Sequence, residues 1–140
     1  DVFSQLNFLI GLHKPIIKFD FNDVTFLNTN KSYLESILLN LLTNSIKYKS
    51  DSRKLKININ CSRLDDDTVV LTFGDNGIGI DLDKNRDKIF GLYQRFHDYS
   101  DSKGLGLYLV KSQVETMGGT ISIESKVNVG TTFILTFKNK

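Results

Sequence analysis

Hydrophobic residues recur every three or four positions in three segments of the chain, which is the spacing of a helix with one apolar face. The three segments are residues 1–12, 32–46 and 105–117. We expect Pro15 to end the first helix, and Gly118 to end the third as a left-handed C-cap. Ser32 and Glu35 have the spacing of a capping box, so we expect them to begin the second helix.

Apolar and polar residues alternate in the remaining segments, as they do in half-buried strands. Such strands are expected within residues 16–28, 55–64, 68–75, 120–125 and 131–137. Polar turns at residues 65–67 and 127–130 would make one hairpin of the second and third strands and another of the fourth and fifth. Residues 83–97 suggest one or two short helices. Helices that alternate with hairpin-connected strands predict a two-layer α/β sandwich with a mixed sheet.

The composition is that of one soluble domain. The chain has 140 residues, of which 40% are hydrophobic and 24% are charged, and its net charge is only +2. This charge argues against a general nucleic-acid or membrane binder. The lone Cys61 excludes an internal disulfide and a multi-cysteine zinc site. No apolar run is long enough to span a membrane, and a chain that starts at Asp1 is expected to be a piece of a longer protein.

Three polar side chains share one face of the second predicted helix. Asn40 and Asn44 are four residues apart, and Lys47 follows three residues later. Amide oxygens suit Mg²⁺, which keeps several waters and takes its other ligands from substrate phosphates. The alternative is that these residues are only the solvated face of an amphipathic helix.

Two glycine-containing segments carry further candidate chemistry. Residues 75–81 (DNGIGID) follow a predicted strand, where glycines permit a close approach of the backbone and a carboxylate can accept a hydrogen bond from adenine. Residues 104–107 (GLGL) open the third helix, where free N–H groups and the helix dipole attract anions. Either segment alone is equally consistent with an ordinary turn or cap, and Arg95, His97 and Lys103 between them with surface charges.

The order of these segments resembles the catalytic and ATP-binding domain of sensor histidine kinases, in the superfamily of gyrase, chaperone and mismatch-repair ATPases. The resemblance extends from about Tyr33 to Phe137. Its boxes are the N box (40–48), the G1 box (75–81), the F box (88–96), the G2 box (104–107) and a G3-like segment (130–133). The amino-acid sequence of residues 91–97 and 104–119 further resembles that of sensor kinases of Bacteroidetes-type bacteria. The resemblance implies the Bergerat fold, in which helices cover one face of a mixed, mostly antiparallel sheet.

The resemblance also implies ATP and Mg²⁺ as cofactors and gives roles to individual residues. Asp75 would recognise adenine through a hydrogen bond, Asn44 would bind Mg²⁺, and Asn40 would contact the ion or the phosphates. Lys47 would meet a phosphate, and Arg95 would neutralise charge on the γ-phosphate. The other nucleotide-binding residues that it implies are Tyr48, Gly77, Gly79, Ile80, Tyr93, Lys103, Gly104, Leu105, Gly106, Leu107 and Thr132.

Asn40 separates the reactions of the superfamily. ATP-hydrolysing members carry a glutamate four residues before the Mg²⁺ asparagine, whereas an amide has no useful basicity near neutral pH. The resemblance therefore implies transfer of the γ-phosphoryl group to a histidine on a separate dimerisation hairpin, and then to a response regulator. The alternatives are a superfamily ATPase or an anti-sigma-like serine kinase, which Asn40 opposes, and a regulatory module without kinase activity, which Asn44 and Asp75 oppose.

The resemblance divides the chain near its N-terminus. Residues 1–18 would be the remnant of the dimerisation and phosphoacceptor helix or a linker, and residues 19–140 would be the ATP-binding domain. His13 is expected to be a linker residue, because no acidic residue follows it as in the acceptor motif. The implied protein is a homodimer whose isolated domain is a monomer, without a nucleic-acid partner. The domain would lie in the cytoplasm, whether or not its parent sensor is anchored in a membrane.

Overall fold

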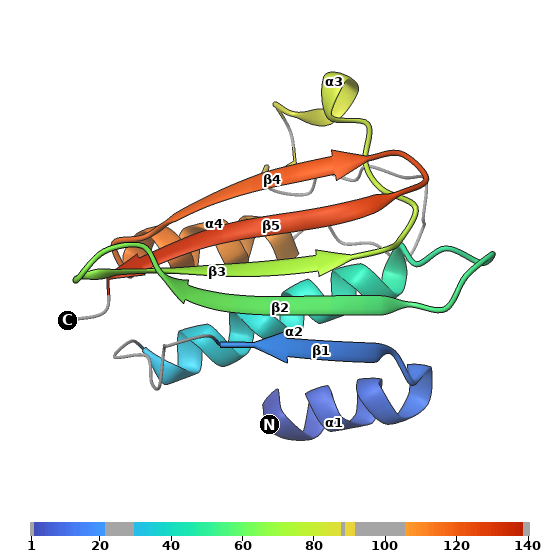
Figure 1. The fold of residues 1–140 in the computed structure, drawn as a ribbon, viewed down its shortest axis with the longest axis horizontal. Helices are drawn as coiled ribbons and strands as arrows, with labels where there is room; N and C mark the ends of the chain where they lie inside the picture. Colours follow the sequence, from blue (N-terminus) through green and yellow to red (C-terminus); the bar gives the residue numbers. More distant parts are fainter. Residues whose placement is uncertain (1, 22–29, 88, 92–105, 139–140) are drawn as a thin grey trace.

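A computed structural model describes residues 2–21, 30–87, 89–91 and 106–138. The elements are α1 (Val2–His13), β1 (Ile16–Asp20), α2 (Lys31–Lys47), β2 (Lys56–Arg63), β3 (Thr68–Asp75), α3 (Leu82–Asn85), α4 (Gly106–Thr116), β4 (Thr120–Lys126) and β5 (Gly130–Lys138). Figure 1 shows one sheet with α2 and α4 packed behind it, α1 beside β1 at one edge, and α3 beyond β4 at the other. The predicted two-layer α/β sandwich is confirmed.

The five strands form a mixed sheet in the order β1-β2-β3-β5-β4. β1 runs parallel to β2, while every other neighbouring pair is antiparallel. The two expected hairpins, β2–β3 and β4–β5, are present, and β3 pairs with β5 at the centre of the sheet. In this register Asp75, the last residue of β3, lies opposite Thr131 near the start of β5.

The hydrophobic core lies between the sheet and the two long helices. Alternate residues of β3 and β5 point toward the helices, because successive side chains of a strand face opposite ways. The buried residues at this interface include Val69, Leu71 and Phe73 of β3, Phe133, Leu135 and Phe137 of β5, Ile37 and Leu41 of α2, and Val110 and Val114 of α4. The other face of the sheet carries none of the described helices (Figure 1).

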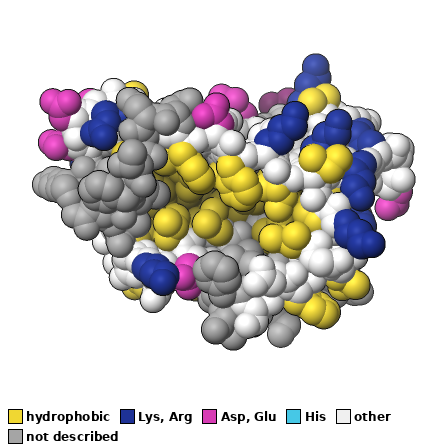
Figure 2. Space-filling view, turned by 60° about the horizontal axis from the view of Figure 1, so that its bottom comes forward, with side chains coloured by type: hydrophobic (Ala, Val, Ile, Leu, Met, Phe, Trp, Pro, Cys, Tyr) yellow, Lys and Arg dark blue, Asp and Glu magenta, His cyan; other side chains and the backbone are white. Residues whose placement is uncertain are grey.

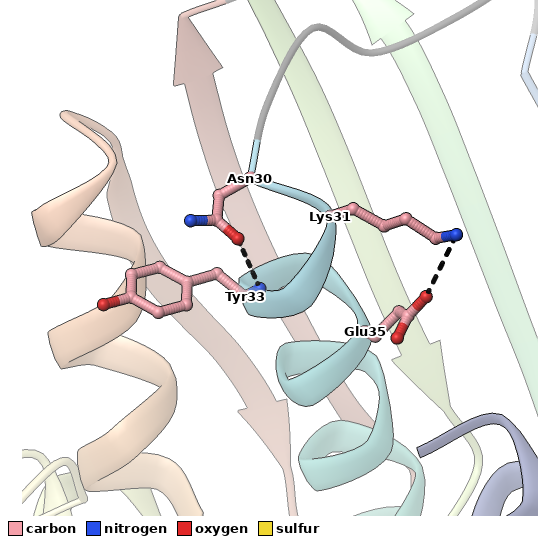
Figure 3. Close-up of polar contacts among 4 residues, drawn as sticks. All are labelled: Asn30, Lys31, Tyr33 and Glu35. Atoms are coloured by element: carbon pink, nitrogen blue, oxygen red, sulfur yellow. Dashed lines mark hydrogen bonds and ion pairs between the residues drawn. The ribbon is translucent and has the colours of Figure 1, made fainter. Parts of the chain in front are cut away.

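The start of α2 differs from the prediction. Asn30 is the N-cap, and its side-chain Oδ1 accepts a hydrogen bond from the backbone N–H of Tyr33 at 3.0 Å (Figure 3). Glu35 instead faces Lys31, with 3.9 Å between the charged atoms. The capping-box prediction for Ser32 was therefore wrong: the helix begins two residues earlier than an N-cap at Ser32 would place it, and asparagine caps a helix about as well as serine does.

The other helix ends follow the expected chemistry. α1 ends at His13, two residues before Pro15, as predicted. Gly118 has a positive φ of 76°, and the next residue, Gly119, donates its N–H to the carbonyl of Val114 at 2.9 Å, which confirms the C-cap of α4. Of the short helices expected in residues 83–97, the structure contains α3, while residues 88 and 92–97 lie outside the described part of the chain.

Apolar side chains are exposed on α1 and β1. Phe8, Leu12 and Phe19 each expose more than 60% of their surface, and Ile16 and Phe21 expose more than 40%. Figure 2 shows hydrophobic side chains gathered on the face that carries these two elements, with Lys and Arg side chains toward one end. None of the helices in the described ranges is long and apolar enough to cross a membrane.

Candidate functional site

The polar face of α2 lies beside the start of α4. Asn40, Asn44 and Lys47 are all half-buried on this helix, and Tyr48 is its buried C-cap residue. A Cβ atom placed on Gly106, the first residue of α4, would lie 3.7 Å from Oδ1 of Asn40. The structure thus brings the N box together with the part of the G2 box that it describes.

The carboxylate of Asp75 is held at the end of β3 by two hydrogen bonds. The Ser45 hydroxyl donates to Oδ2 at 2.7 Å, and the backbone N–H of Gly77 donates to Oδ1 at 2.9 Å. Ser45 follows Asn44 directly and is only 1% exposed, so its hydrogen bond joins the Asp75 carboxylate to the buried side of α2. One contact from α2 and one from its own loop therefore orient Asp75, in addition to the hydrogen bond from Thr131 of β5.

Ser45 was not among the site residues predicted from the sequence, although the helical pattern of α2 indicates that it is buried. Residues 37, 41 and 45 lie four apart on the stripe of α2 that faces the core, and the first two are Ile37 and Leu41. A serine in this buried stripe needs a hydrogen-bond partner. That requirement predicts a polar group opposite position 45, and Asp75 is that group.

The environment of Asp75 changes its acidity in two opposing ways. Burial raises the pKa of its carboxyl group above the ordinary value, because desolvation penalises the charged form. Hydrogen bonds from Ser45, Gly77 and Thr131 lower the pKa, but they do not cancel the effect of burial. The site therefore holds a carboxylate that is more basic than one in water, a property suited to accepting a hydrogen bond.

The G1 loop packs closely against its neighbours, and two glycines are required for this. A Cβ on Gly77 would lie 2.6 Å from the carbonyl oxygen of Tyr48, which also accepts a hydrogen bond from the N–H of Ile78 at 2.9 Å. Gly79 has a φ of 76°, and a Cβ there would collide with the carbonyl of Lys126. The loop thus rests on the end of α2 on one side and on the β4–β5 turn on the other.

The structure separates the two threonines of the G3-like segment. Thr131 is buried, lies opposite Asp75 and points to the same face of the sheet as Phe133. Thr132 lies on the opposite face, where its Oγ1 would be 3.0 Å from a Cβ on Gly74. Thr131 is therefore the threonine that lies opposite Asp75 across the strands, while the predicted residue Thr132 lines a pocket that also includes Asp75.

Two other predicted contact residues are part of the core. Ile80 and Leu107 are both buried in the hydrophobic cluster, and the N–H of Ile80 donates to the hydroxyl of Ser125 at 2.8 Å. Their side chains pack in the hydrophobic core and so anchor the G1 loop and α4 to it. The predicted residues Tyr93, Arg95, Lys103, Gly104 and Leu105 lie outside the described residues.

A groove of about 400 Å³ reaches Asn40 from the side of α1. It is lined by Ser4, Gln5, Phe8 and Leu9 of α1 and by Leu39, Asn40 and Thr43 of α2. Most of the lining is apolar. Asn40 therefore lies between this groove and the start of α4.

The described residues contain no cluster of three or more His, Cys, Asp or Glu side chains that could hold a metal ion. A divalent cation at this site would rely on the amide oxygen of Asn44 together with ligands from phosphates and water. That donor set fits Mg²⁺, which binds hard oxygen ligands and is often held by only one or two protein groups.

A sheet with one helix-covered face, and a carboxylate at the end of β3 beside the asparagine face of α2, define an ATP-binding α/β sandwich with the Bergerat fold. The chain belongs to the histidine kinase-, DNA gyrase B- and HSP90-like ATPase family, which it matches over residues 29–140.

Individual relatives point to the sensor kinases within that family. The chain is 32% identical over 112 residues to the heme sensor protein HssS of Staphylococcus saprophyticus, a match that covers 80% of this chain and 24% of that protein. It is 35% identical over 118 residues to the sensor protein RprX of Bacteroides fragilis, covering 81% and 22%. The fold is similar to that of the mycobacterial sensor histidine kinase MprB, with a TM-score of 0.79 at 20% identity over 99% of this chain and 93% of that one.

Proposed function

We propose that this domain binds Mg²⁺ and ATP beside α2 and passes the γ-phosphoryl group to a histidine on a dimerisation hairpin of the same protein. A response-regulator aspartate would then receive it. The observation that carries the proposal is the Asp75 carboxylate, fixed by Ser45 and Gly77 next to the polar face of α2. Because the chain spans only 24% and 22% of HssS and RprX, the activity of the whole protein is part of the proposal.

Asp75 is proposed to select adenine. Its Oδ2 accepts from Ser45 and its Oδ1 from Gly77, and a carboxylate has about four lone-pair sites, which leaves room for another donor beside Thr131. An exocyclic amine can therefore be added to this arrangement without breaking it, with Thr131 and a water beside it. Guanine presents a carbonyl oxygen in place of that amine, so the same carboxylate would repel it.

The phosphates are proposed to lie between α2 and the start of α4. Asn44 would hold Mg²⁺, which when bound cancels negative charge on the phosphates. Asn40 and Lys47 would contact the phosphates from α2, and the N–H groups of residues 104–107 from the N-terminus of α4. Arg95 of the F box and Lys103, just before the G2 box, would add positive charge. Tyr48 and Tyr93 would border the base and ribose. In phosphoryl transfer, such positioning and charge neutralisation supply most of the rate.

The proposed reaction is transfer to a protein histidine rather than hydrolysis. Asn40 occupies the position where a hydrolase of this superfamily needs a glutamate, and an amide cannot take a proton from water. The relatives are named as sensor proteins and histidine kinases, which supports the same choice.

Residues 1–18 are proposed to be the end of the dimerisation helix or the linker to it, with the ATP-binding domain over residues 19–140. The exposed apolar residues of α1 and its groove beside Asn40 support this division, because a free helix would not present so much apolar surface. The isolated chain would be a monomer and the whole protein a homodimer. We place the domain in the cytoplasm, where ATP is available.

Calorimetry with ADP and a non-hydrolysable ATP analogue, each with and without Mg²⁺, tests the binding site. We expect binding of both, tighter binding of the triphosphate with Mg²⁺, and a loss of binding in Asp75→Asn. Asp66→Asn, at the exposed tip of the β2–β3 hairpin, is the matched control and should bind like the wild type. Unchanged affinity in Asp75→Asn would refute the assignment of the site.

Phosphoryl transfer is tested on the parent protein. With γ-labelled ATP, we expect an acid-labile and base-stable label, which is the behaviour of phosphohistidine. A label stable to acid would indicate a serine or threonine product, and release of free phosphate without labelled protein would indicate an ATPase.

A further inference from the structure

Arg53, in the connection between α2 and β2, donates hydrogen bonds to three backbone carbonyls. Its Nε donates to the carbonyl of Asn76 at 2.7 Å, and its Nη2 donates to the carbonyls of Gly77 at 2.8 Å and Asn128 at 2.9 Å. The first two carbonyls are consecutive in the G1 loop, and the third lies in the turn between β4 and β5. Three converging carbonyls match the planar, multi-donor guanidinium, which a lysine ammonium cannot imitate.

One of these contacts leads directly to Asp75. The carbonyl of Asn76 and the N–H of Gly77 belong to the same planar peptide unit. Arg53 binds the oxygen of that unit, and Asp75 Oδ1 binds its hydrogen. A cation on the carbonyl polarises the peptide and strengthens the hydrogen bond on its other side. Arg53 thus fixes the plane, and with it the direction in which the N–H of Gly77 points.

The surrounding contacts leave this plane few other supports. The side chain of Asn76 accepts from the N–H of Lys56 at 2.8 Å and donates to the carbonyl of Lys54 at 2.9 Å, which anchors the residue before Gly77 to the start of β2. The next residue, Ile78, is joined to Tyr48 and to Asn128 through its backbone. Between these two anchors, the carbonyl of Asn76 accepts a hydrogen bond from Arg53.

We propose that Arg53 is a positioning residue for nucleotide recognition, which aims the carboxylate of Asp75 through the Asn76–Gly77 peptide. This inference rests on the proposed nucleotide site. Arg53 does not touch the nucleotide in this proposal. Its charge and its fork of donors set the geometry of Asp75, and thereby the preference of the site for adenine.

The experiment compares Arg53→Gln and Arg53→Lys with Arg63→Gln, whose arginine is exposed at the far end of β2. The first measurement is the amide proton shift of Gly77 by NMR in the nucleotide-free domain. We expect it to move upfield in both Arg53 variants, because the hydrogen bond to Asp75 weakens. The second is the affinity for ADP and for GDP by calorimetry. We expect about a tenfold loss for ADP in Arg53→Gln, because weakening the hydrogen bond from Gly77 to the Asp75 carboxylate should cost about as much as one hydrogen bond to a charged group.

Each outcome decides the proposal. A shifted Gly77 amide with a reduced ratio of ADP to GDP affinity, and an unchanged control, supports it. An unchanged Gly77 amide overturns it, as does full recovery in Arg53→Lys, because then charge alone would be sufficient. A loss of global stability with an unchanged affinity ratio would show a purely structural role and would also overturn it. If Arg53→Gln does not fold, Arg53→Lys carries the test.

The inference and the proposed function fail in different ways. Wild-type protein that binds no adenine nucleotide would refute the proposed function. The Gly77 amide shift is measured without nucleotide, so it would still show whether Arg53 acts on the peptide that faces Asp75.

Discussion

Asp75 is a residue whose role in binding conflicts with stability. Its pKa is raised by burial, so the folded state retains the proton to a higher pH than the unfolded chain does. A group of this kind contributes most to stability below the unfolded-state pKa of about 3.9, and the contribution is lost as the pH rises through the folded-state pKa. The ionised form that the proposed function requires is thus the less stable one.

Asp75→Asn should remove this pH dependence, because an amide does not titrate and can still bond to Ser45 and Gly77. We expect the free energy of unfolding of the variant to increase relative to that of the wild type as the pH rises from 4 to 7.5, because the wild type alone loses stability over this range. Urea unfolding across this range measures it, with Asp66→Asn as the control. A difference that stays constant with pH would show that Asp75 has an ordinary pKa.

Ser45 provides a separate test of how the carboxylate is held. Ser45→Ala removes the donor to Oδ2 of Asp75, so the pKa of Asp75 should rise further and adenine recognition should weaken. We expect the free energy of ADP binding to become less favourable by about 1.5–3 kcal/mol, as is typical for the loss of a hydrogen bond to a charged group. Calorimetry measures this. Ser112→Ala, at an exposed position of α4, should have no effect.

Asn40 tests the choice between transfer and hydrolysis. In Asn40→Glu a carboxylate would replace the amide beside the start of α4, at the position of the missing water-activating base. We expect the rate of ATP hydrolysis by the isolated domain to rise roughly tenfold or more, since general-base catalysis typically contributes about 10²–10⁴. A phosphate-release assay measures it. An unchanged rate would mean that Asn40 does not face the γ-phosphate.

At the scale of elements, α2 is the helix on which the site depends. Its N-cap is Asn30, so Asn30→Ala should lower the free energy of unfolding by about 1 kcal/mol. Ser32→Ala should change it by less than about 0.5 kcal/mol, because Ser32 is an exposed residue of the first turn. Urea unfolding distinguishes the two. The opposite order of effects would restore the capping box that the sequence suggested.

The boundaries of elements show what the sequence could predict. Strand alternation placed β2 to β5 correctly because each strand has one face in the core and one outside it. The capping error arose because Asn30 and Ser32 are both good N-caps, and only the packing of α2 selects between them. Motif position alone suggested Thr132, whereas the strand register that places Thr131 opposite Asp75 could not be predicted from the sequence. Arg53 carried no local signal, since its partners are carbonyls distant in the chain.

At the scale of the molecule, α1 is proposed to be an appendage of the domain. Deletion of residues 1–14 should therefore leave ADP affinity within about twofold of the full chain, a change below about 0.5 kcal/mol. It should also reduce binding of a hydrophobic dye such as ANS, because Phe8 and Leu12 are lost from the exposed apolar face. A large loss of affinity would mean that α1 is part of the nucleotide site.

The pairing of β3 with β5 has a consequence for how the domain is made. The two hairpins of the sheet are local in sequence, but Asp75 and Thr131 meet only when these hairpins join at the centre. During synthesis β5 emerges after the other four strands, so the nascent domain has no complete site until β5 has emerged. ATP therefore cannot guide the earlier stages of folding. Bound nucleotide can only slow the separation of β3 from β5 after the sheet has formed. It therefore stabilises the folded domain against unfolding and does not speed its folding.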